Sequence, residues 1–149
     1  MKILIINGPN LNMLGKRDKN HYGSFTLADV ERAVNYKASE LGVEVGFYQS
    51  NHEGLLIDLI QKASENFSGI VINPGAFTHY SYAIRDAIEA CGVPVIEVHI
   101  SDIHKREKFR SISVTEPVCI EQIFGLGINS YIVGLNNLVS YILGRLPNE

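Results

Sequence analysis

The sequence predicts an α/β domain whose parallel sheet is covered by helices on both faces. Short, continuous apolar runs at residues 3–6 and 69–72 are typical of strands that are buried on both sides. These runs alternate with longer segments in which apolar residues recur every three or four positions, as in amphipathic helices. Because the chain has 149 residues and is 46% apolar, it can bury a sizeable core, and we expect one domain over residues 1–149.

The first part of the chain predicts a strand, a long loop, a helix and a second strand. The strand at residues 3–6 is followed by a polar loop over residues 8–25, which is longer than an ordinary strand-to-helix connection. Such long loops in compact domains often act as lids. Residues 26–29 predict a helix start, Gly42 predicts its end, and residues 43–47 predict the second strand.

A second helix and a third strand are expected next. Ser50 and Glu53 have the spacing of a capping box, which predicts the helix start. The strand at residues 69–72 is stopped by Pro74, which cannot donate to a sheet, and by Gly75, which permits a sharp turn. The helix that begins near Ser50 is expected to turn Leu55, Leu56, Leu59, Ile60 and Ala63 toward the sheet.

The last part of the chain predicts two more strands and two more helices. The strands are expected at residues 94–100 and within residues 118–124. The helix before them has an inward stripe of Tyr80, Ala83, Ile84, Ala87, Ile88 and Cys91, which leaves Arg85, Asp86 and Glu89 facing away from the sheet. The final helix has a stripe of Tyr131, Ile132, Leu135, Leu138, Val139 and Ile142.

Five strands connected by right-handed crossovers favour a flavodoxin-like, doubly wound sheet with the strand order 2-1-3-4-5. In this topology, the residues that directly follow each strand meet at one edge. This edge is expected to collect polar side chains from three loops: Asn10, Arg17, Tyr22, Asn73, His79, His99, Ser101 and Arg110.

The overall composition excludes several classes of protein. A formal net charge of −3 gives no global cationic field, so we expect neither a nucleic-acid-coating protein nor one that binds anionic membranes. No apolar run approaches the length of a membrane span, and the opening apolar run is too short for a signal peptide. We therefore expect a soluble, cytoplasmic protein. Cys91 and Cys119 are expected to be small buried side chains, because neither has a metal-ligand spacing.

The edge residues favour proton transfer over cofactor chemistry. No glycine-rich phosphate fingerprint is present, so we expect no nucleotide cofactor. The five histidines match no standard zinc motif, and we expect no catalytic metal. Glu97 and His99 lie two apart on an expected strand, so the carboxylate can orient and charge the imidazole, although a merely structural buried ion pair has the same pattern.

Tyr22 is a candidate base because Arg17 is close to it in the sequence. A phenol becomes a usable base at neutral pH only when cationic neighbours favour its phenolate, and a guanidinium is always charged. The alternative is that Tyr22 only anchors the loop by packing. Arg110 is a second cation at the edge. Its neighbours Lys105, Arg106 and Lys108 are expected to lie on a solvated turn.

Seven motifs in order resemble the type II 3-dehydroquinate dehydratases over almost the whole length of the chain. They are Gly8-Pro9-Asn10-Leu11-Asn12, Gly15 with Arg17, Tyr22-Gly23-Ser24, Gln49-Ser50-Asn51-His52-Glu53-Gly54, Asn73-Pro74-Gly75-Ala76, Glu97-Val98-His99-Ile100-Ser101, and Arg106-Glu107 with Phe109-Arg110. The resemblance implies a reversible anti elimination of water from 3-dehydroquinate through an enolate, without metal, nucleotide or Schiff base, in the shikimate or quinate pathway.

The resemblance also implies a role for each residue at the edge. Tyr22 is implied to remove the proton next to the ketone, and Arg17 to favour its phenolate. Asn10 is implied to hold a water that stabilises the enolate oxygen. His99, oriented by Glu97, is implied to protonate the departing hydroxyl. The implied substrate-binding groups are Asn73, His79 and Arg110 for ring hydroxyls, the backbone at Ile100 with Ser101 for the carboxylate, and Asp86 reaching a neighbouring subunit.

The resemblance further implies a homododecamer of four trimers. Phe25, Asp102 and Ser111 depart from the family pattern at the margin of the expected site. Two alternatives remain open at this point: a binding module that sequesters a small carboxylate without turnover, and a flavin-binding electron carrier. The missing phosphate loop disfavours the electron carrier.

Overall fold

The fold is a three-layer α/β arrangement around a five-stranded parallel sheet, seen in a computed structural model that describes residues 1–144. The strand order is β2-β1-β3-β4-β5, which confirms the predicted order. The strands are β1 (Lys2–Asn7), β2 (Glu44–Gln49), β3 (Gly69–Asn73), β4 (Val95–Val98) and β5 (Glu121–Ile123). All four strand pairs are parallel, with Ile5 of β1 between Phe47 of β2 and Val71 of β3.

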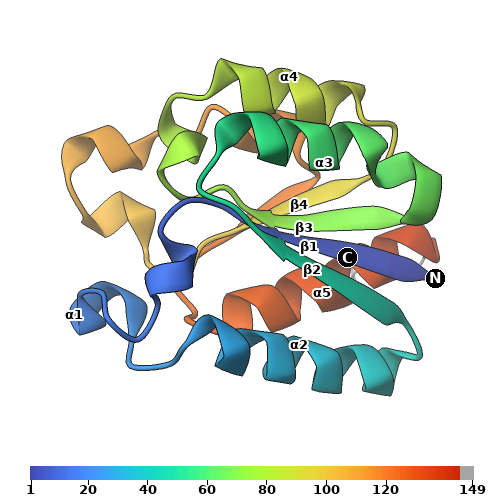
Figure 1. Cartoon of the computed structure of the whole chain (residues 1–149), viewed down its shortest axis with the longest axis horizontal. Helices are drawn as coiled ribbons and strands as arrows, with labels where there is room; N and C mark the ends of the chain where they lie inside the picture. The colour runs from blue at the N-terminus through green and yellow to red at the C-terminus, as the bar shows by residue number, and fades with distance from the viewer. Residues whose placement is uncertain (145–149) are drawn as a thin grey trace.

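Helices cover both faces of the sheet (Figure 1). Helices α2 (Leu27–Leu41) and α5 (Asn129–Ile142) pack on one face, and α3 (Glu53–Asn66) and α4 (Tyr82–Ala90) pack on the other. The central strand β1 is buried on both sides, because Ile3 and Ile5 belong to the core beneath α2 and α5 while Leu4 and Ile6 belong to the core beneath α3 and α4. This arrangement explains the continuous apolar run.

Of the two helix starts predicted from the sequence, one capping box is present and the other is not. Thr26 and Asp29 form the reciprocal capping box at the start of α2, and Gly42 ends the helix in the left-handed conformation, as predicted. The predicted capping box at Ser50 and Glu53 is wrong. Ser50 Oγ instead accepts from the backbone of His52, and the Glu53 carboxylate accepts from Ser81 Oγ at 2.7 Å.

Three residues assigned to inward stripes are exposed. Leu55 is 48% exposed on α3, Tyr80 is 60% exposed because it precedes α4, and Ala83 is exposed on α4. The rest of each stripe packs against the sheet as expected. Arg85, Asp86 and Glu89 lie away from this core, as predicted.

The loop after β1 contains two short helical segments, η1 (Leu11–Met13) and α1 (Lys19–Tyr22). Irregular structure also fills the other connections near this edge, through η2 (Gly75–His79), η3 (Ile103–Lys105), η4 (Lys108–Ser111) and η5 (Glu116–Val118). A Cβ atom at Gly8 would lie 2.5 Å from the Pro74 carbonyl oxygen, so only glycine lets the loops after β1 and β3 approach this closely.

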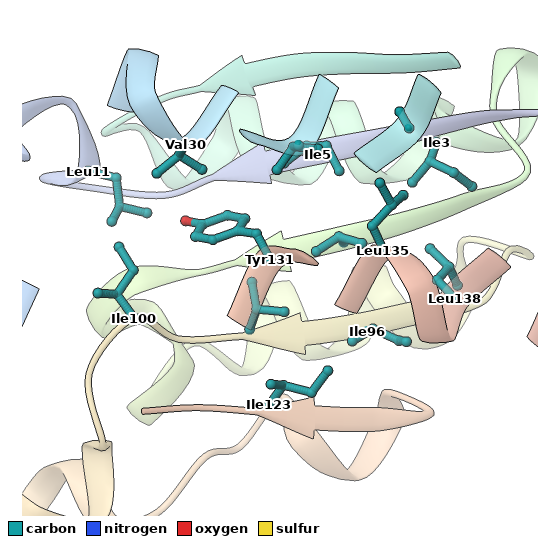
Figure 2. Packing of buried hydrophobic residues seen from close by; sticks show 14 of the residues in the cluster. Ile3, Ile5, Leu11, Val30, Ile96, Ile100, Ile123, Tyr131, Leu135 and Leu138 are labelled. Carbon is teal, nitrogen blue, oxygen red and sulfur yellow. The ribbon is translucent and has the colours of Figure 1, made fainter. Parts of the chain in front are cut away.

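Tyr131 fastens this edge of the sheet from within the core. Its side chain is fully buried, and Figure 2 shows its ring between α5 and the sheet. The hydroxyl donates to Asn7 Oδ1 at 2.6 Å and accepts from Asn73 Nδ2 at 3.0 Å. Because Asn7 and Asn73 end β1 and β3, one phenol fixes the two strand ends that carry the loops of the site.

Candidate active site

One cavity at the carboxyl edge of the sheet gathers nearly all of the predicted site residues. Figure 1 shows that the loops after β1, β3 and β4 come together at this edge. Of the predicted residues, the cavity wall contains Asn10, Arg17, Tyr22, Asn73, His79, His99, Ile100, Ser101 and Arg110. Glu97 lies directly behind His99. Asp86 lies elsewhere, on the exposed surface of α4.

Tyr22 is held by two arginines from distant parts of the sequence. Its hydroxyl accepts a hydrogen bond from Arg17 Nη2 at 2.8 Å and another from Arg106 Nη1 at 2.6 Å. The Arg17 guanidinium also lies over the phenol ring, 3.7 Å from its centroid. Hydrogen bonds from charged donors stabilise negative charge on the oxygen that receives them. The two guanidinium groups therefore place positive charge beside the Tyr22 hydroxyl oxygen.

The prediction that Arg106 lies on a solvated turn is wrong. Arg106 contacts Tyr22, and its Nη1 also lies 3.3 Å from Ser101 Oγ. Its Nε is buried and has no hydrogen-bond partner within residues 1–144. The predicted exposure of Lys105 and Lys108 is confirmed. A run of basic residues does not reveal which one turns inward, and the only available signal was that Arg106-Glu107 belongs to the family motifs.

His99 and Glu97 form a buried pair at the same cavity. His99 is 4% exposed and Glu97 is fully buried. His99 Nε2 lies 2.9 Å from Glu97 Oε2. Burial raises the pKa of Glu97, but the hydrogen bond and charge of His99, together with hydrogen bonds from Gln122 and Thr115, outweigh burial and lower that pKa to about 2.

The ionised Glu97 determines which imidazole nitrogen can act in the cavity. A carboxylate only accepts hydrogen bonds, so Nε2 of His99 must carry a proton. Nδ1 has no partner among the residues that the structure describes. It is therefore the nitrogen that can exchange a proton with a bound molecule. β4 ends at Val98 rather than at residue 100, so His99 lies just past the strand, where its amide still donates to the Ile123 carbonyl at 2.8 Å.

Asn10 and Asn73 occupy fixed positions on the wall. Asn10 has φ 69°, the only non-glycine residue with positive φ in residues 1–144, and its amide donates to Asn51 Oδ1 at 3.0 Å. Asparagine tolerates this left-handed conformation better than most residues. Asn73 Oδ1 accepts from the Gly75 amide, and Nδ2 has a second hydrogen beyond the one given to Tyr131.

His79 and Arg110 add polar groups to the same wall. The imidazole Nδ1 lies 2.8 Å from the Ile112 carbonyl, so Nδ1 donates and Nε2 is left as an acceptor. Burial lowers the pKa of His79. The hydrogen bond to Ile112 raises this pKa, but the charges of His99 and Arg110 lower it further. Arg110 donates through Nε to Glu107 at 2.6 Å, which fixes its side chain beside His79.

The segment after β4 presents backbone donors. Within the described residues, the N–H groups of Ile100 and Ser101 donate to no protein acceptor outside the helices and strands. Adjacent free N–H groups on a cavity wall suit an anionic oxygen. Residues 1–144 hold no group of three or more His, Cys, Asp and Glu side chains that could bind a metal ion.

Comparison with known proteins identifies the family. The family model described as class II dehydroquinase matches residues 1–139. The chain belongs to this family. A 3-dehydroquinate dehydratase of Caldicellulosiruptor bescii is 60% identical over 135 residues, which cover 90% of this chain and 93% of that protein. One from Thermotoga neapolitana is also 60% identical, over 91% of this chain and 92% of that protein.

Solved structures of the family have the same fold. The type II dehydroquinase from Butyrivibrio crossotus is 55% identical and superposes with a TM-score of 0.90, covering 93% of this chain and 97% of that chain. The type II dehydroquinase from Propionibacterium acnes is 39% identical, with a TM-score of 0.89 over 93% of this chain and 96% of that chain. The family resemblance and the flavodoxin-like fold predicted from the sequence are confirmed. No helix in the described part of this dehydroquinase is long and apolar enough to cross a membrane.

Proposed function

We propose that this dehydroquinase is a hydro-lyase that converts 3-dehydroquinate reversibly into 3-dehydroshikimate and water. The observation that carries the proposal is that one cavity contains both a phenol that receives two guanidinium hydrogen bonds and an imidazole hydrogen-bonded to an ionised carboxylate. This pairing supplies a base and an acid. The proposed biological context is the shikimate pathway of aromatic biosynthesis or the breakdown of quinate.

The first step is removal of a proton from the carbon next to the ketone. The Tyr22 phenolate takes this proton, while the positive charges of Arg17 and Arg106 stay beside its oxygen. The electron pair of the broken C–H bond forms a carbon–carbon double bond, and the π electrons of the ketone move onto its oxygen to form an enolate. Asn10, fixed in its left-handed conformation by Asn51, holds a water that donates to this oxygen.

The second step expels water. The enolate electrons return to form the carbon–carbon double bond as the C–O bond of the leaving hydroxyl breaks. His99 gives its Nδ1 proton to this hydroxyl, and the negative charge of Glu97 supports the imidazolium before the transfer. Transfer of the proton from Tyr22 back to His99 through solvent restores both groups.

The remaining wall residues bind the substrate. The free amides of Ile100 and Ser101 receive the carboxylate, and Asn73, His79 and Arg110 bind ring hydroxyls. Asp86 acts at the site of a neighbouring subunit in the proposed dodecamer of four trimers. Its position on the exposed, outward side of α4 agrees with that role.

The direct test measures formation of the conjugated product by its ultraviolet absorbance. Tyr22→Phe should lower kcat by about 10²–10⁴-fold, the usual contribution of a positioned base. Tyr36→Phe is the matched control, because Tyr36 is 72% exposed on α2, and it should retain wild-type kcat. Full activity in Tyr22→Phe would remove the proposed base. Saturable binding of dehydroquinate by the wild type without product would identify a binding module instead.

A further inference from the structure

A buried cluster of hydroxyl groups lies behind the His99–Glu97 pair. Its members are Thr78 in η2 and Ser113 and Thr115 in the segment after η4. Thr78 and Thr115 are completely buried, and Ser113 is 9% exposed. The Val114 amide donates to the Thr78 carbonyl at 2.7 Å, which fastens the two segments together. None of these residues lines the cavity.

All three hydroxyls converge on the Glu97 carboxylate. Thr78 Oγ1 lies 2.9 Å and Ser113 Oγ 3.1 Å from Oε1, and Thr115 Oγ1 also donates to that oxygen. On the other side, Oε2 receives Gln122 Nε2 at 2.5 Å, in addition to His99 and Ser113. Ser113 Oγ accepts from the Glu116 amide, so its own proton is available for Glu97.

The number of donors favours a negative carboxylate. Three hydroxyls, one amide and one imidazole surround two oxygens, which together accept about four hydrogen bonds. The hydroxyls also lie 2.7–3.2 Å from one another, so they share their protons between Glu97 and each other. A protonated Glu97 would add a donor and remove an acceptor position in a buried site that already has more donors than acceptors, which is costly. The cluster therefore favours the ionised form of Glu97 beyond what His99 alone provides.

The other charged and titratable groups around Glu97 do not replace these donors. His99 follows β4, His79 ends η2, and Arg110 in η4 is beside His79. Burial, and to a lesser degree the charge of Glu97, raise the pKa of the Cys119 thiol, so Cys119 adds no charge. Of these groups, His99 has the direct hydrogen bond to the carboxylate.

We propose that Thr78, Ser113 and Thr115 are positioning residues for the acid step, which hold Glu97 as an anion aimed at His99 and so keep the transferable proton on Nδ1. They act through Glu97 and do not touch the substrate. Their absence would let Glu97 turn or take up a proton, and the imidazolium would lose its support. This inference rests on the proposed function, because it assumes that His99 is the acid.

The test compares Thr115→Val, which removes the hydroxyl while keeping the side-chain shape, with Thr115→Ser, which restores a hydroxyl. Thr115→Val should lower kcat about tenfold, the worth of one charged hydrogen bond, and change KM less than twofold. Thr115→Ser should recover most of the lost rate. Ser130→Ala is the control, because Ser130 is a fully buried hydroxyl that accepts from Leu126 and does not contact Glu97, and it should keep wild-type kcat.

A double-mutant cycle separates positioning from a general loss of structure. In a Glu97→Gln background, Thr115→Val should change kcat less than twofold, because the group through which Thr115 acts is gone. Equal losses in both backgrounds, or wild-type kcat in a folded Thr115→Val protein, would overturn the inference. If Glu97→Gln has no measurable turnover, the test depends on Thr115→Ser. A kcat close to that of the wild type in Thr115→Ser would support the positioning role, and a kcat as low as that of Thr115→Val would overturn it.

Three further outcomes distinguish failure of the variant, of the proposed function and of the positioning role. If Thr115→Val does not fold, Ser113→Ala removes another hydroxyl of the cluster from the same carboxylate, and its kcat and KM are interpreted in the same way. If the wild type itself forms no product, the proposed function fails. If the wild type is active and the variants keep its kcat, only the positioning role fails.

Discussion

Tyr22 and His99 face the same cavity but are held there by different kinds of structure. Tyr22 lies in the four-residue helix α1, at the periphery of the molecule in Figure 1, and its hydroxyl is fixed by two arginine side chains. His99 follows a central strand, and its partner Glu97 is fully buried and receives donors from several segments. The Tyr22 ring is buried in the core beneath α2 and α5, but its hydroxyl depends on a few charged contacts, whereas both members of the acid pair are buried and Glu97 receives donors from several segments.

The acid half of the site, His99 with Glu97, and the base half, Tyr22 with its two arginines, should therefore respond differently to substitution. Changes at the acid half should affect folding and activity together, because a buried charge is left without partners. Changes at the base half should affect activity with little loss of stability, because the Tyr22 hydroxyl is at the cavity surface and its partners are partly solvated. The next three predictions test this contrast.

Glu97→Gln should have the largest combined effect. It places an amide donor among hydroxyl, amide and imidazole donors, so the unfolding free energy should fall by about 3–5 kcal/mol and kcat by about 10²–10⁴-fold. Urea denaturation and the product assay measure the two losses. The matched control is Glu53→Gln, since this carboxylate also accepts from a serine but lies outside the cavity. A Glu97→Gln protein as stable as the wild type would contradict the inference that Glu97 and its buried partners stabilise the fold.

Stability should also depend on acid pH through Glu97. Its pKa is about 2 in the folded protein and near 4.5 when unperturbed, so between these values the unfolded chain binds more protons. The contribution is complete above pH 4.5 and is lost as pH falls toward 2, at most about 3 kcal/mol.

The measurement is urea denaturation at a series of pH values for wild type and Glu97→Gln. Hydrogen bonds also lower the pKa values of surface carboxylates such as Asp29 and Glu107. Both proteins contain these groups, so their contributions cancel in the difference between the two stabilities. The two stabilities should therefore converge as pH decreases. A constant difference over this range would show that Glu97 is not the group that titrates.

Arg106→Gln should have the smallest effect on stability and a clear effect on rate. It removes one of the two charged donors to Tyr22, so kcat should fall by about 10–100-fold while the unfolding free energy changes by less than about 1 kcal/mol. Arg32→Gln, at an exposed ion pair on α2, should leave kcat unchanged. Loss of stability comparable to that of Glu97→Gln would remove the contrast between the two halves.

The strand order, the edge at which the loops meet and most of the cavity wall were predictable from the amino-acid sequence. Hydrophobic periodicity and turn residues are local signals, and parallel crossovers leave few topologies, so residues as distant as Asn10 and Arg110 could be assigned to one edge. The Thr26 cap was predictable for the same reason, because both partners lie within one turn.

The contacts between polar groups at that edge could not be predicted from the sequence, because they depend on how distant segments pack together. Arg106 was predicted to lie in a solvated basic run, yet it hydrogen-bonds to Tyr22, which is 84 positions away in the sequence. Ser50 and Glu53 had the right spacing for a cap but found other partners. The hydroxyls around Glu97 carry no periodic signal at all. Hydrogen bonds between distant segments depend on how the loops pack, and local sequence patterns do not encode that packing.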